Sequence, residues 1–131
     1  MPQSDLDTIA QVYQAFTTRD FGVIPRLFDP DIVIAQADEL PWGGHFRGHA
    51  GAVEFFTTLL AHLDSTVDSQ QMFAAGDRVV QVGRTTGTTV PGGIAFDVPE
   101  VHVWQLRAGR ITSYEAYIDT PAMLAALAVR R

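Results

Sequence analysis

The side chains best suited to acid–base chemistry lie in one segment with strand-like alternation, residues 98–106. Glu100, His102 and Trp104 occupy every second position there, so they share one face of the predicted strand. Imidazole, with an unperturbed pKa of about 6.5, can donate or accept a proton near neutral pH. Glu100 either orients the imidazole or lies at the exposed end of the strand. His102 is therefore a candidate acid–base residue, and the alternative is a histidine that only hydrogen-bonds a neighbour.

A second candidate, Tyr13, belongs to an apolar stripe in the N-terminal part of the chain. A phenol donor in an apolar pocket can stabilise an oxyanion. A tyrosine at this spacing can equally be a core residue whose hydroxyl reaches a polar partner. The stripe recurs at the three- and four-residue steps of an amphipathic helix and consists of Leu6, Ile9, Val12, Tyr13 and Phe16.

The sequence contains few motifs for thiol, metal, phosphate-binding or serine-nucleophile sites. The sequence has no cysteine, which excludes thiol catalysis and Cys-ligated metal clusters. His45 and His49 have i, i+4 spacing, but Gly48 argues against one continuous helix through both. Glycine pairs at 43–44 and 92–93 lack the surroundings of a phosphate-binding loop, and no nucleophile-elbow motif occurs. We therefore expect no metal site and no cofactor.

Composition limits the class of protein. The chain has 131 residues, of which 47% are hydrophobic, as expected for one domain over residues 1–131. Nine Lys and Arg against fifteen Asp and Glu give a net charge of −6, which argues against a nucleic-acid partner. Residues 1–7 do not resemble a signal peptide, and the longest apolar run, 122–129, is too short to span a membrane. We expect a cytoplasmic protein with no membrane association.

The order of predicted elements is that of an α+β domain in which helices cover one face of a curved sheet. Ser4 is the expected N-cap of the first helix, and Arg19-Asp20 should end it. The later helices are expected at 21–28, 50–62 and 122–129, the last one opened by Thr120-Pro121. A strand is expected at 31–35, and consecutive antiparallel strands at 66–74, 78–86, 96–106 and 110–118.

This order and three local strings resemble the SnoaL-like branch of the nuclear transport factor 2-like superfamily, which contains ketosteroid isomerases and polyketide cyclases. The strings are residues 12–16 with Asp20, residues 41–44 with 46–48, and residues 102–111 with 117–119. The resemblance covers nearly the whole chain. It implies a cone-shaped barrel, in which a strongly curved, mostly antiparallel sheet is covered by the three helices of the N-terminal half, plus a C-terminal helix. It also implies a homodimer formed through the outer sheet face, and an apolar pocket in each protomer.

The resemblance also implies roles for individual residues. His102 corresponds to the pocket acid of the isomerases or to the acid–base aspartate of the cyclases, and Tyr13 to the oxyanion-hole tyrosine. An ungapped comparison places Gln36 at the position of the isomerase base, where an amide cannot abstract a proton. Matching the turn at 41–43 brings Asp38 to that position instead, if the strand continues that far. The alternative for Asp38 is a solvated residue in the loop.

The family pattern assigns further side chains to the pocket. In the last strand it points Thr112, Tyr114, Ala116 and Ile118 toward the cavity, and the alternating set Ile111, Ser113, Glu115 and Tyr117 away from it. Glu115 and Tyr117 are assigned to the outer, dimeric face. Trp42 is expected either to gate the entrance or to anchor its loop. The predicted ligand contacts are Trp104, Tyr114, Glu100, Trp42, Gln36, Ile118 and Phe56.

These residues predict a cofactor-independent enzyme that transfers protons on an apolar carbonyl compound. His102 would be the acid or base, Tyr13 the hydrogen-bond donor and Asp38 the base. The alternative is a non-catalytic protein of the same fold that binds an apolar metabolite, or a dimerisation module. A missing carboxylate at position 36 favours the alternative, and His102 beside Glu100 favours the enzyme.

Overall fold

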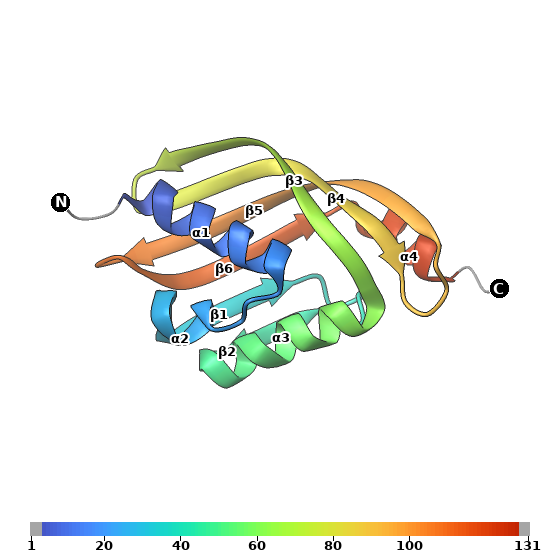
Figure 1. Ribbon diagram of the computed structural model, residues 1–131, viewed down its shortest axis with the longest axis horizontal. Coiled ribbons are helices and arrows are strands. Elements are labelled where there is room, and N and C mark those ends of the chain that lie inside the picture. Colours follow the sequence, from blue (N-terminus) through green and yellow to red (C-terminus); the bar gives the residue numbers. More distant parts are fainter. Residues whose placement is uncertain (1–3, 129–131) are drawn as a thin grey trace.

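The computed structural model describes residues 4–128, and it has the α+β architecture that the sequence predicts (Figure 1). Helices α1, α2 and α3 lie on one side of a curved six-stranded sheet, and α4 lies at one end (Figure 1). The elements are α1 (Asp5–Thr18), α2 (Val23–Leu27), β1 (Phe28–Gln36), β2 (Gly44–Arg47), α3 (Gly48–His62), β3 (Leu63–Ala75), β4 (Arg78–Thr89), β5 (Ala95–Arg107), β6 (Arg110–Ile118) and α4 (Thr120–Ala128).

The sheet has the strand order β2-β1-β6-β5-β4-β3. Strands β3 to β6 are consecutive antiparallel neighbours, as predicted. Two features were not predicted: β1 pairs with β6 in parallel, and the short strand β2 pairs with β1. Periodicity identifies a strand but not its partner, and β2 has only four residues in a glycine-rich stretch, too few to show a pattern.

The first helix begins and ends where its capping residues predict. The Ser4 hydroxyl accepts a hydrogen bond from the backbone N–H of Asp7, and Arg19 adopts the left-handed conformation, with φ 58°, that ends the helix. The second helix, Val23–Leu27, is shorter than the predicted range of 21–28. It ends at Leu27, and Phe28 is already extended, because Asp29 precedes a proline and is disfavoured in helical geometry.

The remaining boundaries differ by up to three residues from the predictions. Helix α3 begins at Gly48, β3 begins at Leu63, and β4 continues to Thr89. Strand β6 has the predicted bounds. The predicted last residue of the C-terminal helix, 129, lies outside the described residues.

A β-bulge in β6 changes the predicted orientation of its first residues. The β5–β6 ladder pairs Leu106 with Ile111 and Gln105 with Ser113, so Thr112 is an extra residue in β6. Ile111 consequently lies on the inner face, fully buried, and its predicted outward orientation is wrong. The Thr112 hydroxyl bonds the backbone oxygen of Gln105 instead of facing a pocket. From Tyr114 onward the predicted alternation holds.

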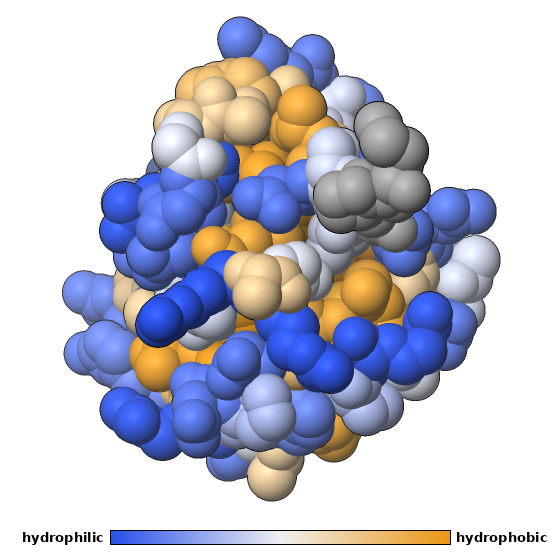
Figure 2. Space-filling view, turned by 90° about the vertical axis from the view of Figure 1, so that its left-hand side faces the viewer, coloured by the Kyte–Doolittle hydropathy of each residue, from blue (hydrophilic) through white to orange (hydrophobic). Residues whose placement is uncertain are grey.

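The core lies between the inner face of the sheet and the helices. Four buried aromatic rings, those of Phe28, Phe55, Phe56 and Trp104, contribute large apolar surfaces to it. Figure 2 views the end of the molecule where the β3–β4 and β5–β6 turns lie. Hydrophilic side chains cover most of this end, with apolar side chains visible between them (Figure 2).

Gly83 is required where β3 and β4 approach closely. A Cβ atom there would lie 2.2 Å from the backbone oxygen of Asp68, which cannot move without disturbing the β3–β4 ladder. We therefore expect Gly83→Ala to lower the free energy of unfolding in urea by about 1–3 kcal/mol, the usual penalty for overpacking. The control is Gly22→Ala, whose nearest neighbour is the side-chain oxygen of exposed Asp20. Equal stability of the two variants would contradict the prediction.

Candidate functional site

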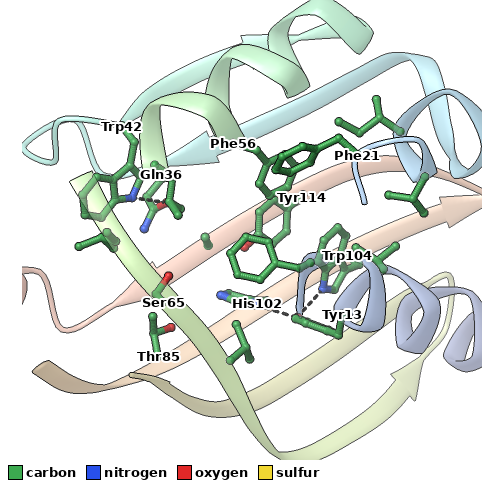
Figure 3. Close-up of a pocket in the computed structure, with 18 of the residues that line it drawn as sticks. Tyr13, Phe21, Gln36, Trp42, Phe56, Ser65, Thr85, His102, Trp104 and Tyr114 are labelled. Carbon is green, nitrogen blue, oxygen red and sulfur yellow. Dashed lines mark hydrogen bonds between the residues drawn. The ribbon is translucent and has the colours of Figure 1, made fainter. Parts of the chain in front are cut away.

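A mostly apolar cavity lies between the inner face of the sheet and the helices (Figure 3). Side chains from all four helices, from β1 and β3 to β6, and from the β1–β2 loop line it. Its free volume is about 70 Å³. Trp104 and Tyr114 form one wall, with their rings stacked at a centroid distance of 4.0 Å, and Phe56 faces them from α3. These three residues and Ile118 line the cavity, as the sequence predicts.

The hydroxyl of Tyr13 joins α1 to β5 inside this cavity. Its oxygen lies 2.7 Å from Nδ1 of His102, and it accepts a hydrogen bond of 2.9 Å from the indole Nε1–H of Trp104 (Figure 3). The rings of Tyr13 and His102 stack with an angle of 9° between their planes. Both side chains line the cavity. The structure therefore brings together two of the three predicted catalytic residues, which are 89 positions apart in the sequence.

Glu100 lies next to His102 on the same inner face of β5. Its Oε2 is 3.5 Å from Nε2 of His102, and its Oε1 accepts a hydrogen bond of 2.9 Å from the amide of Gln81. The Glu100 side chain is fully buried, so of the two positions left open for it, the one beside the imidazole is correct. It is not among the residues that line the cavity, and its contact with a ligand stays a prediction.

Burial determines the charge of each group in this network. It lowers the pKa of His102 to about 3, because a buried imidazolium lacks solvation. It raises the pKa of Glu100 to about 8, which keeps the carboxylic acid protonated at neutral pH. Burial also raises the pKa of Tyr13 far above its ordinary value. Near neutral pH all three groups are therefore uncharged.

The donors and acceptors of the network allow two arrangements. Trp104 can only donate, and a neutral imidazole has one donor nitrogen and one acceptor nitrogen. When Glu100 carries a proton toward Nε2, His102 is protonated on Nδ1 and donates to Tyr13, whose own proton is free to point into the cavity. When Glu100 is ionised, Nε2–H faces it and Tyr13 donates to Nδ1. The protonation of Glu100 thus decides whether the phenol can donate to a ligand.

The structure does not bring the third predicted catalytic residue, Asp38, to the cavity. Strand β1 ends at Gln36, which pairs with Gly44 of β2, so the chain turns between them and Asp38 lies exposed in that turn. The expectation that the strand continues to Asp38 is wrong, because pairing with β2 requires this turn.

Gln36 and Trp42 line the cavity together, as predicted. The indole Nε1–H of Trp42 donates a 3.0 Å hydrogen bond to Oε1 of Gln36. Trp42 is only 1% exposed and packs beside the ring of His62, so it anchors its loop and is not a gate at the surface.

Comparison with known proteins identifies the family. The family model for the SnoaL-like domain matches residues 9–114. The chain belongs to the SnoaL-like domain family. No curated protein matches it.

Solved structures share the fold of this SnoaL-like domain over nearly its whole length. A nuclear transport factor 2-like protein from Burkholderia thailandensis is 27% identical, with a TM-score of 0.89 over 98% of this chain and 100% of that one. TerC, crystallised with polyporic acid, is 27% identical, with a TM-score of 0.87 over 95% and 98%. IdmH from Streptomyces antibioticus, a candidate polyketide cyclase, is 29% identical, with a TM-score of 0.77 over 97% and 100%.

Sequence reasoning missed several polar residues of the SnoaL-like cavity. Ser65 and Thr85 are buried and line it, and Asp20 lies at its rim. Gln81 is fully buried beside Glu100. The alternation of β3 and β4 was the available signal, since Ser65 lies between inward Leu63 and half-buried Val67, and Gln81 between inward positions 79 and 83.

Metal and membrane features are not found in residues 4–128 of the SnoaL-like chain. No group of three His, Asp or Glu side chains in this range is arranged to hold a metal ion. His45 lies in β2 and His49 in α3, where it hydrogen-bonds the backbone oxygen of Phe28. None of the helices in the range is long and apolar enough to cross a membrane.

The buried Glu100 should make the stability of the domain fall as the pH rises from about 6.5 to about 8. In this range an unfolded glutamate, with its ordinary pKa of 4.5, is ionised, whereas Glu100 in the folded chain keeps its proton up to a pKa of about 8. The folded state then binds more protons than the unfolded state, so the free energy of unfolding falls with pH. Below pH 6.5 an unfolded histidine is protonated whereas His102 in the folded chain stays neutral, because its pKa is lowered. This group makes the free energy of unfolding rise with pH and offsets the effect of Glu100.

Chemical unfolding at pH 6.5 and 8.0 measures this effect. The wild type should lose up to about 2 kcal/mol over the interval, from one proton at about 1.36 kcal/mol per pH unit. Glu100→Gln, which keeps the shape but does not titrate, should lose less. Glu54→Gln, on the exposed face of α3, serves as the control and should behave as the wild type. A wild-type slope no steeper than that of Glu100→Gln would refute the assignment of the buried acid.

Proposed function

We propose that this SnoaL-like protein is a cofactor-independent enzyme that acts on an apolar carbonyl compound held in the cavity. The observation that carries the proposal is the Tyr13 hydroxyl, which lines an apolar cavity and is positioned by His102 and Trp104. With Glu100 protonated, the phenol donates to the carbonyl oxygen. Enolisation and carbonyl addition both develop negative charge on that oxygen, and a buried donor stabilises it more strongly than water does.

The two arrangements of the network are the states before and after proton delivery. Tyr13 gives its proton to the substrate oxyanion and receives the Nδ1 proton of His102, while Nε2 receives the proton of Glu100. The last transfer requires Oε2 of Glu100 to close the 3.5 Å gap to Nε2 of His102, which no hydrogen bond bridges, and the negative charge then passes from the substrate oxygen to the Glu100 carboxylate. The pKa of about 8 for Glu100 suits an acid that is still protonated at neutral pH. Glu100 acts as the acid through His102, without contacting the substrate.

The relatives support a carbonyl-containing substrate. IdmH is a candidate polyketide cyclase, and TerC was crystallised with polyporic acid. Both share more than a quarter of their residues with this chain over nearly its whole length. Polyketides carry repeated carbonyl groups, and their cyclisation develops charge on carbonyl oxygens, which is the charge that Tyr13 is placed to stabilise.

One observation favours binding without catalysis as the second candidate function. Removal of a carbon-bound proton needs a base, and position 36, where the family resemblance places that base, holds an amide. Among the lining residues within 4–128, the one carboxylate is Asp20, at the rim of the cavity. If Asp20 cannot reach the substrate, the protein binds the carbonyl compound and leaves it unchanged.

Exchange of carbon-bound hydrogen in D2O distinguishes the two functions. We use 2-tetralone, an apolar ketone with acidic protons beside its carbonyl, and follow their loss by proton NMR. The wild-type protein should accelerate the exchange over buffer, and Tyr13→Phe should reduce that acceleration by about 10²–10³-fold, as expected when an oxyanion donor is removed. The acceleration should also fall as the pH rises through about 8, because with Glu100 ionised the Tyr13 hydroxyl donates its hydrogen bond to Nδ1 of His102 and not to the ketone.

Tyr117→Phe is the matched control for this experiment, because Tyr117 is 56% exposed and points away from the cavity. It should leave the exchange rate unchanged. Binding of 2-tetralone without acceleration by the wild-type protein would favour the binding function and end the proposal of an enzyme.

We also propose that two protomers associate through the outer face of the sheet. Apolar side chains form two adjacent rows on this face, as the ladders of β3 to β6 show. They are half-buried or exposed in the single chain. Together, the two rows form an apolar surface of the kind that homodimers bury. The rows contain Phe73, Val80 and Val103, and then Val82, Val101 and Tyr117.

A charge in the middle of this face should separate the protomers. Sedimentation equilibrium of the wild type should give twice the mass of one chain. Val82→Lys should give the mass of one chain, because position 82 lies opposite Gln71 and Val101, and an ammonium without a carboxylate partner cannot be buried without a large penalty. The control Val53→Lys changes an exposed valine on α3 and should remain dimeric. A monomeric wild type would rule out the interface.

A further inference from the structure

The cavity contains polar groups that have no partner in the protein. Gln36, Ser65 and Thr85 come from β1, β3 and β4, are no more than 9% exposed, and line the cavity. Within residues 4–128, no hydrogen bond is made by the Gln36 amide nitrogen or by the hydroxyls of Ser65 and Thr85. Their polar atoms are not among the fully buried atoms that lack a partner, so they are open to the cavity, and a molecule there can hydrogen-bond them.

We infer that these residues form a second polar end of the cavity, and that the ligand is an uncharged, elongated apolar molecule with an oxygen substituent at each end. The inference rests on the proposed function, because Tyr13 supplies the first polar end. Figure 3 shows Gln36, Ser65 and Thr85 at the side of the cavity away from Tyr13.

Trp42 determines what the second end can recognise. An indole N–H only donates, so the atom of Gln36 that it contacts is the amide oxygen, and the amide NH2 group is left for the ligand. The NH2 group donates, and the hydroxyls of Ser65 and Thr85 can donate or accept. Each of these groups suits a ligand hydroxyl or carbonyl oxygen.

The strand ladder gives the backbone separation of Thr85 from His102, whereas Gln36 is separated from His102 across the sheet, on the far side of β6. Thr85 pairs with Val98 of β5, and His102 lies four residues further along the same strand. Four residues of a strand span roughly 13 Å, at about 3.3 Å each. The cavity wall between them includes the apolar side chains of Ala116 and Ile118. A ligand that reaches both ends therefore needs an apolar body of about two rings.

The charges around the cavity favour a neutral ligand. No Lys or Arg is among the residues within 4–128 that line it, and the one charged lining residue is the acidic Asp20 at the rim. Arg84, next to Thr85, is paired with Asp97 and does not line the cavity. An anion inside would lose its hydration without gaining a counter-charge, which is strongly unfavourable.

Three biphenyls test this inference by isothermal titration calorimetry at pH 7, where all are uncharged. The probes are 4,4′-dihydroxybiphenyl, 4-hydroxybiphenyl and biphenyl, with oxygens at both ends, at one end and at neither end. The wild-type protein should bind the dihydroxy compound about tenfold more tightly than the monohydroxy compound, as expected for one or two additional hydrogen bonds.

The double variant Ser65→Ala/Thr85→Val should remove most of this preference and leave the affinity for 4-hydroxybiphenyl within about twofold of the wild type, because neither hydroxyl holds any other part of the described chain. The matched control is Thr86→Val, whose hydroxyl faces Thr66 and not the cavity. Gln36→Met is measured separately, with circular dichroism to verify folding, because it leaves the Trp42 indole without its acceptor.

Each outcome is decisive. A tenfold preference that the double variant loses and the control keeps supports the inference. Equal binding of the two phenols, or a preference that survives in the double variant, overturns the second polar end and leaves the proposed function standing. Failure of the wild type to bind any biphenyl overturns the inference and the proposed apolar site together. Tyr13→Phe should weaken the binding of both phenols, which tests the first polar end independently.

Discussion

The hydrogen bonds at the Tyr13 hydroxyl are the interaction on which the rest of this structure depends. One oxygen meets Nδ1 of His102 and Nε1 of Trp104, and so connects the first helix to the fifth strand. The contact positions α1 over the sheet and leaves the cavity beside it. Through this hydroxyl the buried acid–base network reaches the cavity, so packing and chemistry depend on the same atom.

Burial gives that network its chemical character. In water Glu100 would be ionised at neutral pH and His102 would be partly protonated, and their charges would attract. Inside the apolar core the desolvation of each charge outweighs the attraction between them, and both groups are neutral instead. The aromatic rings that exclude water, including Trp104 and Tyr114, thereby convert an ion pair into a carboxylic acid beside a neutral imidazole.

The same apolar surroundings explain how the cavity can be selective with few polar groups. Each unpartnered amide or hydroxyl in a dry site costs free energy until a ligand satisfies it, so a single well-placed group discriminates strongly between ligands. At Gln36, Trp42 strengthens this discrimination between ligands, because its hydrogen bond fixes the orientation of the amide. An interior amide in place of a carboxylate also changes the chemistry, since Gln36 can recognise an oxygen but cannot accept a proton from carbon.

The sequence by itself determined the elements with strong periodicity and the faces of their residues: the capped first helix, the strand at 110–118, and the alternation that placed Glu100, His102 and Trp104 on one inner face. These are local properties, and local side-chain patterns encode them. Only the tertiary structure decided that β1 lies parallel to β6, that a bulge at Thr112 buries Ile111, that Asp38 turns into solvent, and that Gln81 and Glu100 meet beside the imidazole. Strand partners and buried contacts join segments far apart in the chain, and their energies come from packing that no local pattern contains.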